Sequence, residues 1–440
     1  MRSLFFPWFI IFLTLVFSPL SLASAQIAFE NVTVISMSGT ETKSPQTVLI
    51  EGDRIRRIGS DIDLPEGTDI IDGRGKFLMP GLTEMHGHVP PLSSSEQAVR
   101  DTLFLYVANG VTTVRGMLGT PGQLSLRDDP VWQDDPAPTL YLAGPSFNGS
   151  SVFSPAQARR KVAEQIEQGW DLLKIHPGLS QEEYLAMAQS AHTLNIDFGG
   201  HVPADVTIET ALRARQRTID HIDGYIEAVN GARNAKTIND FRALAKRTKE
   251  AGVGIVPTMA VWESLLGAIP LEERMKFDEI KYVSARTIDG WRRFFTQERS
   301  IGFLAGSDPH IRHQNRIALL AALYEEGAEI LFGTDAPQVF SVPGFSIHRE
   351  FPIMKEAGMS NYDILKSATG TIGDHFRDKD TFGTLTEGYR ADMVLLGNNP
   401  LEDLDALKAP HGVMIRGRWI DRDAIEAGLL DIETRMEATR

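Results

Sequence analysis

The strongest constraint on the fold is a series of eight short apolar segments that alternate with stretches of helical character. Each segment has the length of one strand and is bounded by glycine, proline or polar residues. Strands that alternate with helices in this way predict an α/β fold, and eight such units predict a (β/α)8 TIM barrel. The segments are FLMPGLTEMHGH (77–88), VTTVRGM (111–117), TLYLAGPSF (139–147), DLLKIHP (171–177), NIDFGGHVP (195–203), TIDHIDG (218–224), GVGIVPTM (252–259) and EILFGTDAP (329–337).

The stretches between these segments carry signals for helix starts. Ser154 precedes Pro155, and Gln157 stands three residues after the serine, which combines a serine cap with a proline at the first helical position. Ser180 and Glu183 form a second capping-box pattern. We therefore expect a helix to begin at each of these serines.

Both ends of the chain have a β-rich pattern. The stretch before the first barrel segment, and GTLTEGYRADMVLLG and HGVMIRGRWIDR near the C-terminus, alternate apolar and polar residues around glycine and aspartate turns. We expect residues 26–80 and 383–425 to form one small β-sandwich domain together. Residues 81–382 would form the barrel, residues 260–312 a helical insertion over its mouth, and residues 426–440 a C-terminal tail.

Residues 1–25 have the pattern of a secretory signal peptide. Arg2 precedes the apolar run LFFPWFIIFLTLVFSPLSL, and Ala23 and Ala25 form an A-x-A cleavage site. The pattern predicts cleavage before Gln26 and a secreted or periplasmic product with no stable membrane insertion. An uncleaved membrane anchor is the alternative, although the run is barely long enough to span a bilayer.

Composition limits the chemistry of a site and the class of partner. The chain contains no cysteine, so a metal site must use histidine, carboxylates or a modified lysine. Its formal net charge of −14 disfavours nucleic acid and anionic membranes as partners. The sequence also has no H-E-x-x-H motif, phosphate-binding loop or nucleophile elbow. The expected partner is a small molecule.

Six polar side chains fall at the C-terminal ends of the predicted strands. His86 and His88 are one residue apart, and the alternation of side chains along a strand turns both to the same face. Each residue alone has an ordinary explanation, such as a loop histidine or an aspartate that starts a turn. Because these strand ends converge on the active site of a TIM barrel, the set predicts a two-metal site. The candidate ligands are His86, His88, Lys174, His201, His221 and Asp335.

The motifs resemble those of the amidohydrolase superfamily, in particular its prolidase-like and imidazolonepropionase-like branch. PGLTEMHGH matches the H-x-H of the first strand, GTDAP the aspartate of the eighth, and DLLKIH the position of a carboxylated lysine. GGHVP and TIDHIDG stand at the two remaining histidine positions, and GTLTEGYRADMVLL resembles the return into the small sheet domain. The resemblance covers nearly all of the chain after the leader.

The resemblance implies two divalent metal ions and a role for each ligand. Lys174 would react with CO₂ to form N6-carboxylysine, a carbamate that bridges both ions. Asp335 would take a proton from a metal-activated water and pass it to the leaving nitrogen. The ligands of one ion would be completed by His86, His88 and Asp335, and those of the other by His201 and His221. Nitrogen and oxygen ligands suit Zn²⁺, with Mn²⁺, Co²⁺ and Fe²⁺ as alternatives. A homo-oligomer is also implied.

Three further residues are candidate substrate contacts. Alternation along its strand turns His176 inward together with Lys174, where it could also be a spare ligand or a polar plug. His348 and Arg349 follow the metal aspartate in the eighth loop, and a guanidinium group can pair with a substrate carboxylate. A salt bridge with Glu350 or another neighbour is the alternative role for Arg349.

The leading prediction is a secreted hydrolase of an amide or peptide C–N bond. N-acyl amino acids and dipeptides are the expected substrates, which includes Xaa-Pro dipeptidase, carboxypeptidase-like and ochratoxin-type chemistry. Several prolidase-like members have an aromatic residue or histidine where this chain has Pro203, so dipeptide specificity does not carry over directly. The nearest alternative is a hydrolase of cyclic amides or lactones. A non-catalytic barrel scaffold is the third, although the retention of all six ligands argues against it.

Overall fold

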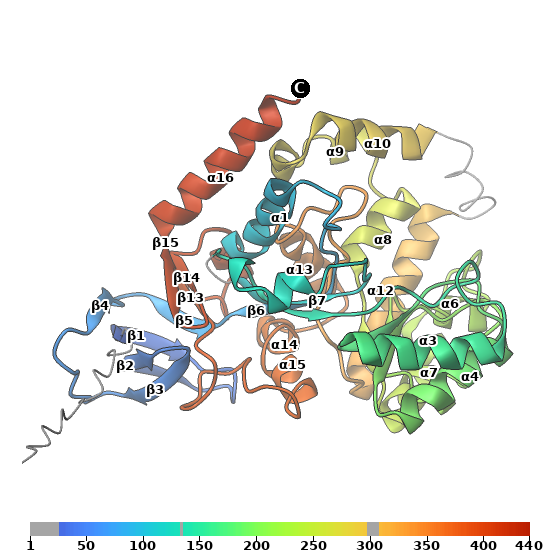
Figure 1. Ribbon diagram of the computed structural model, residues 1–440, viewed down its shortest axis with the longest axis horizontal. Helices are drawn as coiled ribbons and strands as arrows, with labels where there is room; N and C mark the ends of the chain where they lie inside the picture. The colour runs from blue at the N-terminus through green and yellow to red at the C-terminus, as the bar shows by residue number, and fades with distance from the viewer. Residues whose placement is uncertain (1–25, 133–134, 297–307) are drawn as a thin grey trace, which may run out of the picture.

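The computed structural model describes residues 26–132, 135–296 and 308–440. The predicted signal peptide, residues 1–25, lies outside the described residues. The described chain combines a TIM-barrel-like α/β part with a β-sheet at one side (Figure 1). Among the helices of these ranges, none is long and apolar enough to cross a membrane.

Seven of the eight predicted barrel segments form short parallel strands. They belong to a three-stranded sheet in the order β6-β7-β8 and a four-stranded sheet in the order β12-β11-β10-β9. Most of their residues are buried, as expected for parallel strands that are covered by helices on the outside. The strands are β6 (Leu82–Gly87), β7 (Val111–Gly116), β8 (Thr139–Leu142), β9 (Leu172–Ile175), β10 (Asp197–Gly200), β11 (Thr218–Asp220) and β12 (Gly254–Val256).

The eighth segment is irregular, but it lies between β12 and β6. Leu331 N–H donates to the carbonyl of Ile255 at 2.8 Å, and Met85 N–H donates to the carbonyl of Phe332 at 3.0 Å. The two sheets are connected on the other side by Phe147 N–H, which donates to the carbonyl of Lys174 at 2.8 Å. The arrangement is therefore TIM-barrel-like, with isolated backbone bonds rather than regular ladders at the two joints.

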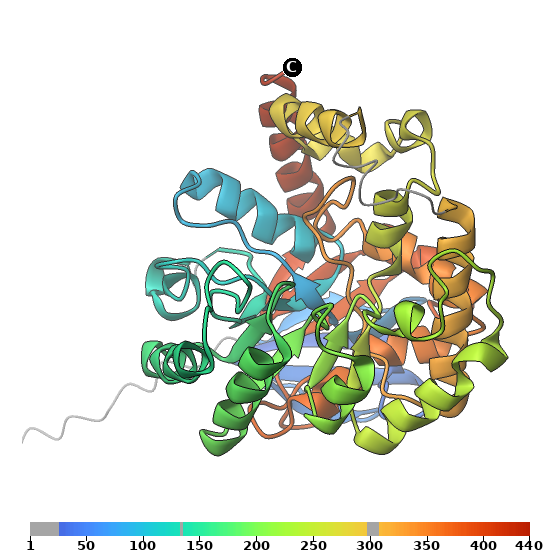
Figure 2. The same ribbon diagram turned by 90° about the vertical axis from the view of Figure 1, so that its right-hand side faces the viewer.

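Helices surround these strands (Figure 2), and the two predicted helix starts are confirmed. Ser154 Oγ accepts from the N–H of Gln157 at 3.3 Å, and Ser180 and Glu183 form a reciprocal capping box. The longer helices are α1 (Glu96–Ala108), α3 (Pro155–Gln168), α4 (Gln181–Thr193), α7 (Ile238–Ala251), α12 (Pro309–Glu326) and α13 (Ile347–Glu356). Shorter ones are α2 (Ser125–Asp128), α5 (Ile208–Arg213), α6 (Tyr225–Ala228), α14 (Asn361–Ser367) and α15 (Gly370–His375).

The small β part is built from strands near both ends of the described chain. Its strands form one hydrogen-bonded sheet in the order β15-β14-β13-β5-β1-β2-β3, with β4 on β1, rather than two separate sheets. The outer strand β3 also bonds to residues 388–391, which precede β13, so the sheet curls around a core of its own. The strands are β1 (Gln26–Ile35), β2 (Thr42–Glu51), β3 (Arg54–Gly59), β4 (Asp69–Asp72), β5 (Phe77–Pro80), β13 (Met393–Leu396), β14 (Gly412–Ile415) and β15 (Arg418–Asp421).

The C-terminal residues differ from the predicted tail. The small sheet ends at Asp421, whose side chain caps helix α16 (Arg422–Glu437). The helix packs against α1, where Arg435 forms an ion pair of 2.6 Å with the buried carboxylate of Asp101. The last residues are therefore part of the fold, and the boundary at 425 is corrected to 421.

The segment 260–312 is helical in its described part. It contains α8 (Met259–Leu266), α9 (Leu271–Arg274), a 3₁₀ helix η2 (Asp278–Tyr282) and α10 (Ala285–Thr296), while α12 already begins at residue 309. In Figures 1 and 2, α9 and α10 lie beside α16. A shared apolar cluster that includes Ile280, Ile288 and Phe340 joins this segment to α16 and to the loop after the eighth segment.

Candidate metal centre and active site

Three of the predicted ligands form a compact group at one end of the barrel-like part. His88 Nε2 lies 2.7 Å from Asp335 Oδ1, and His86 Nε2 lies 3.7 Å from the same oxygen. One ligand atom from each of the three lies within 4.8 Å of the others, a spacing that can hold one metal ion. Lys174 adjoins the group, because its Nζ lies 3.0 Å from His86 Nε2.

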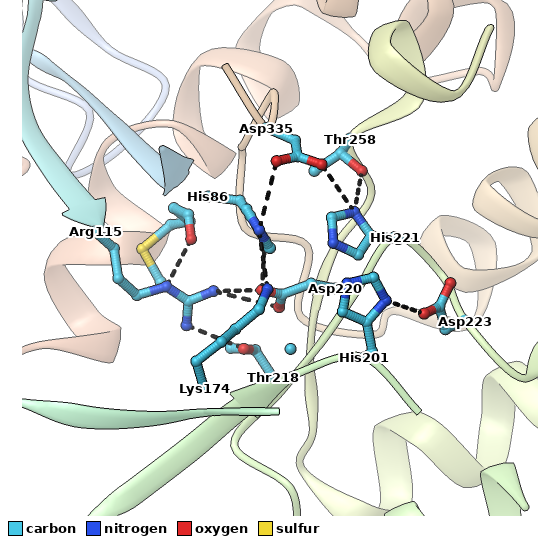
Figure 3. Close-up of polar contacts among 12 residues, drawn as sticks. His86, Arg115, Lys174, His201, Thr218, Asp220, His221, Asp223, Thr258 and Asp335 are labelled. Carbon is cyan, nitrogen blue, oxygen red and sulfur yellow. Dashed lines mark hydrogen bonds and ion pairs between the residues drawn. The ribbon is translucent and has the colours of Figure 1, made fainter. Parts of the chain in front are cut away.

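The two other predicted histidines, His201 and His221, lie beside His86 and Lys174 (Figure 3). The ring of His221 is 4.4 Å from the ring of His86 and 4.4 Å from the ring of His201, measured between centroids. His221 Nδ1 also lies 3.7 Å from Asp335 Oδ2. The structure therefore brings all six predicted ligands together, from the ends of β6, β9, β10 and β11 and from the eighth segment.

The backbone is strained at several of these positions. Asp335 and His221 have φ angles of 61° and 63°, and Thr258, which contacts His221, has a φ of 47°. Such left-handed conformations are uncommon for residues other than glycine and occur often at functional sites. At Asp335 the chain leaves the extended conformation where the side chain meets the histidines.

Hydrogen bonds behind the histidines orient their rings. Asp220 accepts from His86 Nδ1 at 2.6 Å, and Asp223 accepts from His201 Nδ1 at 2.6 Å, so the Nε2 atom of each ring is left for another partner. Arg115, which is buried in β7, donates to Asp220 at 3.1 Å. Carboxylates that fix the orientation of a ligating histidine are a regular feature of metal sites.

Sequence reasoning did not assign roles to these supporting residues. The signal for two of them was present, because TIDHIDG has an aspartate on each side of His221. Nothing in the local pattern showed that Asp220 reaches across to His86, or that Arg115 of another strand holds Asp220. These contacts join β6, β7 and β11 and depend on the closed arrangement of the strands.

Glu84 connects β6, which carries His86, to the eighth segment, which carries Asp335. Its side chain is 1% exposed and accepts from the N–H of His86 at 2.8 Å and from the N–H and hydroxyl of Thr334 at 2.8 and 2.6 Å. Burial raises the pKa of the Glu84 carboxyl to about 7. Glu84 therefore fixes the backbone of β6 to the residue before Asp335.

The protonation states of the site fit metal binding. Burial lowers the pKa of Lys174 to about 8, so a neutral amine, the form that reacts with CO₂, is accessible near neutral pH. Burial also lowers the pKa values of His86 and His221, which keeps their rings neutral. Neutral imidazole is the form that ligates metals. The residues present therefore suit a centre with nitrogen and oxygen ligands, such as one for Zn²⁺.

The rate at which metal-free protein regains activity should depend on the protonation state of Lys174. With a pKa of about 8, the neutral fraction rises about eightfold between pH 7 and pH 8.5. At a fixed concentration of dissolved CO₂, we expect reactivation by Zn²⁺ to be about five- to tenfold faster at pH 8.5 than at pH 7. The recovered activity and the bound metal should both be measured in samples taken at successive times. A reactivation rate that does not depend on pH would contradict the role of a neutral Lys174 amine.

The three predicted substrate contacts lie in different environments. The ring of His176 lies 5.1 Å from that of His201, beside the candidate centre. Burial, together with the charge of the neighbouring Lys174, lowers the pKa of His176 to about 2. His348 instead pairs through Nε2 with Asn109 Oδ1 at 3.0 Å and packs near Phe351. The contacts of His348 are thus with α1 and with its own helix, away from the ligand group.

Arg349 lies near carboxylates of the protein itself, which is the alternative role considered from the sequence. Its partners are not Glu350 but residues of the insertion. Its guanidinium group stacks 3.6 Å from the ring centroid of Phe277 and lies about 4 Å from Glu263 and Glu279. Glu350 instead accepts from the N–H groups at the start of α8 at 2.8 and 2.7 Å. Arg349 therefore ties α13 to the insertion, and the structure does not place it against the ligand group.

Comparison with known proteins agrees with the motifs. A profile of the amidohydrolase family matches residues 77–420. Ochratoxinase from Aspergillus niger is 24% identical over 299 residues, which are 63% of this chain and 51% of that protein. The first curated relatives are matched over about a fifth to a half of their own length.

Solved structures of similar fold cover nearly the whole chain. Bottromycin amidohydrolase aligns with a TM-score of 0.71 at 22% identity, over 93% of this chain and 90% of that one. A Xaa-Pro dipeptidase with bound methionine aligns with a TM-score of 0.68 at 22% identity, over 90% of this chain and 100% of the other. These structures share the fold, and the family profile extends from β5 to β15. The chain belongs to the amidohydrolase family.

Proposed function

We propose that this protein is a secreted, binuclear metal-dependent amidohydrolase that cleaves an amide or peptide C–N bond. N-acyl amino acids and dipeptides are the proposed substrates. The observation that carries the proposal is the convergence of six polar side chains: His86, His88 and Asp335 form one compact group, and Lys174, His201 and His221 adjoin it. Apolar residues would fill the core of a barrel equally well, so the fold alone does not require these polar side chains.

The six residues would hold two divalent ions. His86, His88 and Asp335 suit one, and His201 and His221 the other. Lys174 Nζ would add to the carbon of CO₂ and lose a proton, and the resulting carbamate would give the centre a further anionic oxygen ligand. Divalent metal ions, when bound, supply a Lewis acid for the substrate carbonyl and lower the pKa of water.

Asp335 is the residue that would move a proton. Its carboxylate is 8% exposed, contacts His88 Nε2 through Oδ1 and lies near His221 through Oδ2. Its position between the two histidine groups suits a general base that takes a proton from water at Oδ and delivers it to the leaving nitrogen. Asp220 and Arg115 support this chemistry indirectly, because they hold the His86 ring in one orientation.

The relatives support amide chemistry. A Xaa-Pro dipeptidase, a bottromycin amidohydrolase and an ochratoxinase are among the similar proteins. The competing candidate is a hydrolase of cyclic amides or lactones, which the same centre could serve. A full set of polar ligands argues against a non-catalytic scaffold.

A substrate panel with metal removal tests the proposal. N-acyl amino acids, Xaa-Pro dipeptides, a cyclic amide and a lactone should be assayed before and after dialysis against a strong chelator. We expect turnover of linear amides, its loss after dialysis, and its recovery with Zn²⁺ or Mn²⁺. Turnover of lactones or cyclic amides alone would favour the competing function, and turnover that survives complete metal removal would refute the metal centre.

The remaining proposals concern the closure of the barrel, the export of the protein and its oligomeric state. We infer that the two sheets and the eighth segment close into a (β/α)8 barrel, and that the protein is exported and forms a homo-oligomer. Export is supported by the pattern of residues 1–25, and the protein recovered from its host should then begin at or near Gln26.

A further inference from the structure

We infer that the substrate carries an uncharged apolar group of branched or aromatic size next to the scissile bond, held in a cavity beside His201. The inference rests on the proposed hydrolysis of an amide and specifies which substrates that site takes. It differs from the expectation of a carboxylate bound by His348 and Arg349, because neither residue lines this cavity.

The cavity has the size and lining of a small-molecule pocket. Its volume is about 600 Å³, within the range of about 300–1,000 Å³ that is usual for ligand sites. The loops after β10 and β11, helices α5 and α6, and α8 of the insertion form its walls. Its apolar lining comes from Val202, Pro203, Val206, Ile208, Ala228 and Trp262.

The cavity adjoins the candidate centre at His201. His201 and Asp223 line it and are joined by the hydrogen bond of 2.6 Å between them. The other side of the His201 ring faces His221, whose centroid is 4.4 Å away. Because His201 belongs to both the cavity and the candidate centre, a group that fills the cavity would lie close to the bond to be cleaved.

The charges around the cavity disfavour an anionic group. Its lining includes the carboxylates of Glu209, Asp223 and Glu227 and the guanidinium group of Arg312. Glu209 is paired with Arg247 at 3.3 Å, outside the cavity. Three carboxylates and one guanidinium group therefore line the cavity, so the side chains of the lining do not attract a substrate carboxylate. An uncharged apolar group gains by leaving water for the apolar wall without this cost.

The test varies one side of the substrate at a time. In the first series the acyl group is acetyl and the released amino acid is glycine, leucine, phenylalanine or glutamate. In the second the released amino acid is glycine and the acyl group is acetyl, isovaleryl, phenylacetyl or succinyl. In one of the two series we expect kcat/KM to be at least about tenfold higher for the apolar members than for the small and anionic ones. A lack of this preference in both series would overturn the inference.

A filling substitution and a matched control assign the preference to the cavity. Ala228 is exposed at the rim and lines the cavity, whereas Asp205 is exposed nearby and does not line it. Ala228→Phe should remove the preference by raising KM for the apolar substrates, whereas Asp205→Phe should keep both the preference and the activity of the wild type. An unchanged preference in Ala228→Phe would contradict the assignment.

A ligand without a scissile bond separates this inference from the proposed function. Titration of the metal-loaded protein with 4-phenylbutan-2-one, followed by tryptophan emission, should show saturable binding that Ala228→Phe weakens at least about tenfold. Binding of this kind without hydrolysis of any amide would support the cavity and refute the proposed function. Hydrolysis without any binding of the ketone would support the proposed function and overturn the cavity inference.

Discussion

Lys174→Ala is expected to lose most of its bound metal and to reduce kcat/KM by more than about a thousandfold. The lysine is fully buried, its Nζ lies 3.0 Å from His86 Nε2, and its pKa is lowered to about 8 by burial. It is therefore the group in this cluster that can become a bridging carbamate. Formate, acetate or propionate should restore part of the metal content and activity of Lys174→Ala, because each supplies the missing carboxylate.

Lys161 provides a matched control for this substitution. Burial also lowers the pKa of Lys161 to about 8, but its Nζ donates to the carbonyl of Ser146 and the hydroxyl of Ser151, outside the ligand group. Lys161→Ala should keep its metal and its activity. A Lys174→Ala protein that is active and fully loaded with metal would contradict the role assigned to Lys174.

Asp335→Asn is expected to retain at least one metal ion while kcat falls by a factor of at least about 10² to 10⁴, the usual contribution of a general base. Asparagine keeps the size and one oxygen of the side chain, so the contact with His88 can persist, but it cannot accept a proton from water. Metal content by mass spectrometry and single-turnover rates should be measured together, since a loss of both would indicate only a lost ligand.

Asp101→Asn is the control for Asp335→Asn. Asp101 is another largely buried carboxylate, paired with Arg435 at 2.6 Å between α1 and α16. Its substitution should lower the free energy of unfolding with little effect on kcat. An Asp335→Asn protein with wild-type kcat would refute its role as the base.

The positions of the ligands could be predicted from the sequence because a barrel-like fold determines where strand ends meet. His86, His88, Lys174 and His201 follow or end apolar strands, and side-chain alternation sets their direction. The structure brings these residues together with His221 and Asp335. The helix starts at Ser154 and Ser180 could be predicted for a similar reason, since capping depends on residues three positions apart.

The residues around the ligands could not be placed by this reasoning. His348 and Arg349 follow the metal aspartate in the chain, but they sit on α13, whose faces point in different directions. Glu350 caps α8, while His348 meets Asn109 and Arg349 meets Phe277. His348 and Arg349 are therefore close to Asp335 in the sequence without lying against the ligand group. Successive side chains on a helix point in different directions, so neighbours in the sequence can contact different parts of the fold.

The C-terminal helix was missed although a signal existed. Asp421 is a capping residue, and Ile425, Leu429, Ile432 and Met436 recur at helical spacing after it. These four apolar side chains pack against α1 and the insertion. Both lie far from the C-terminus in the sequence, so the local pattern did not show what the helix would cover. The irregular eighth segment is a different case, because the positive φ of Asp335 serves the site rather than the local preference of the sequence.

The most direct test of a binuclear centre is a crystal structure of the metal-loaded protein with anomalous diffraction measured at the absorption edge of the metal. The account predicts two anomalous peaks, one among His86, His88 and Asp335 and one beside His201 and His221, with the side chain of Lys174 extended by a carboxylate that contacts both. A single peak among His86, His88 and Asp335, with an unmodified Lys174, would contradict it.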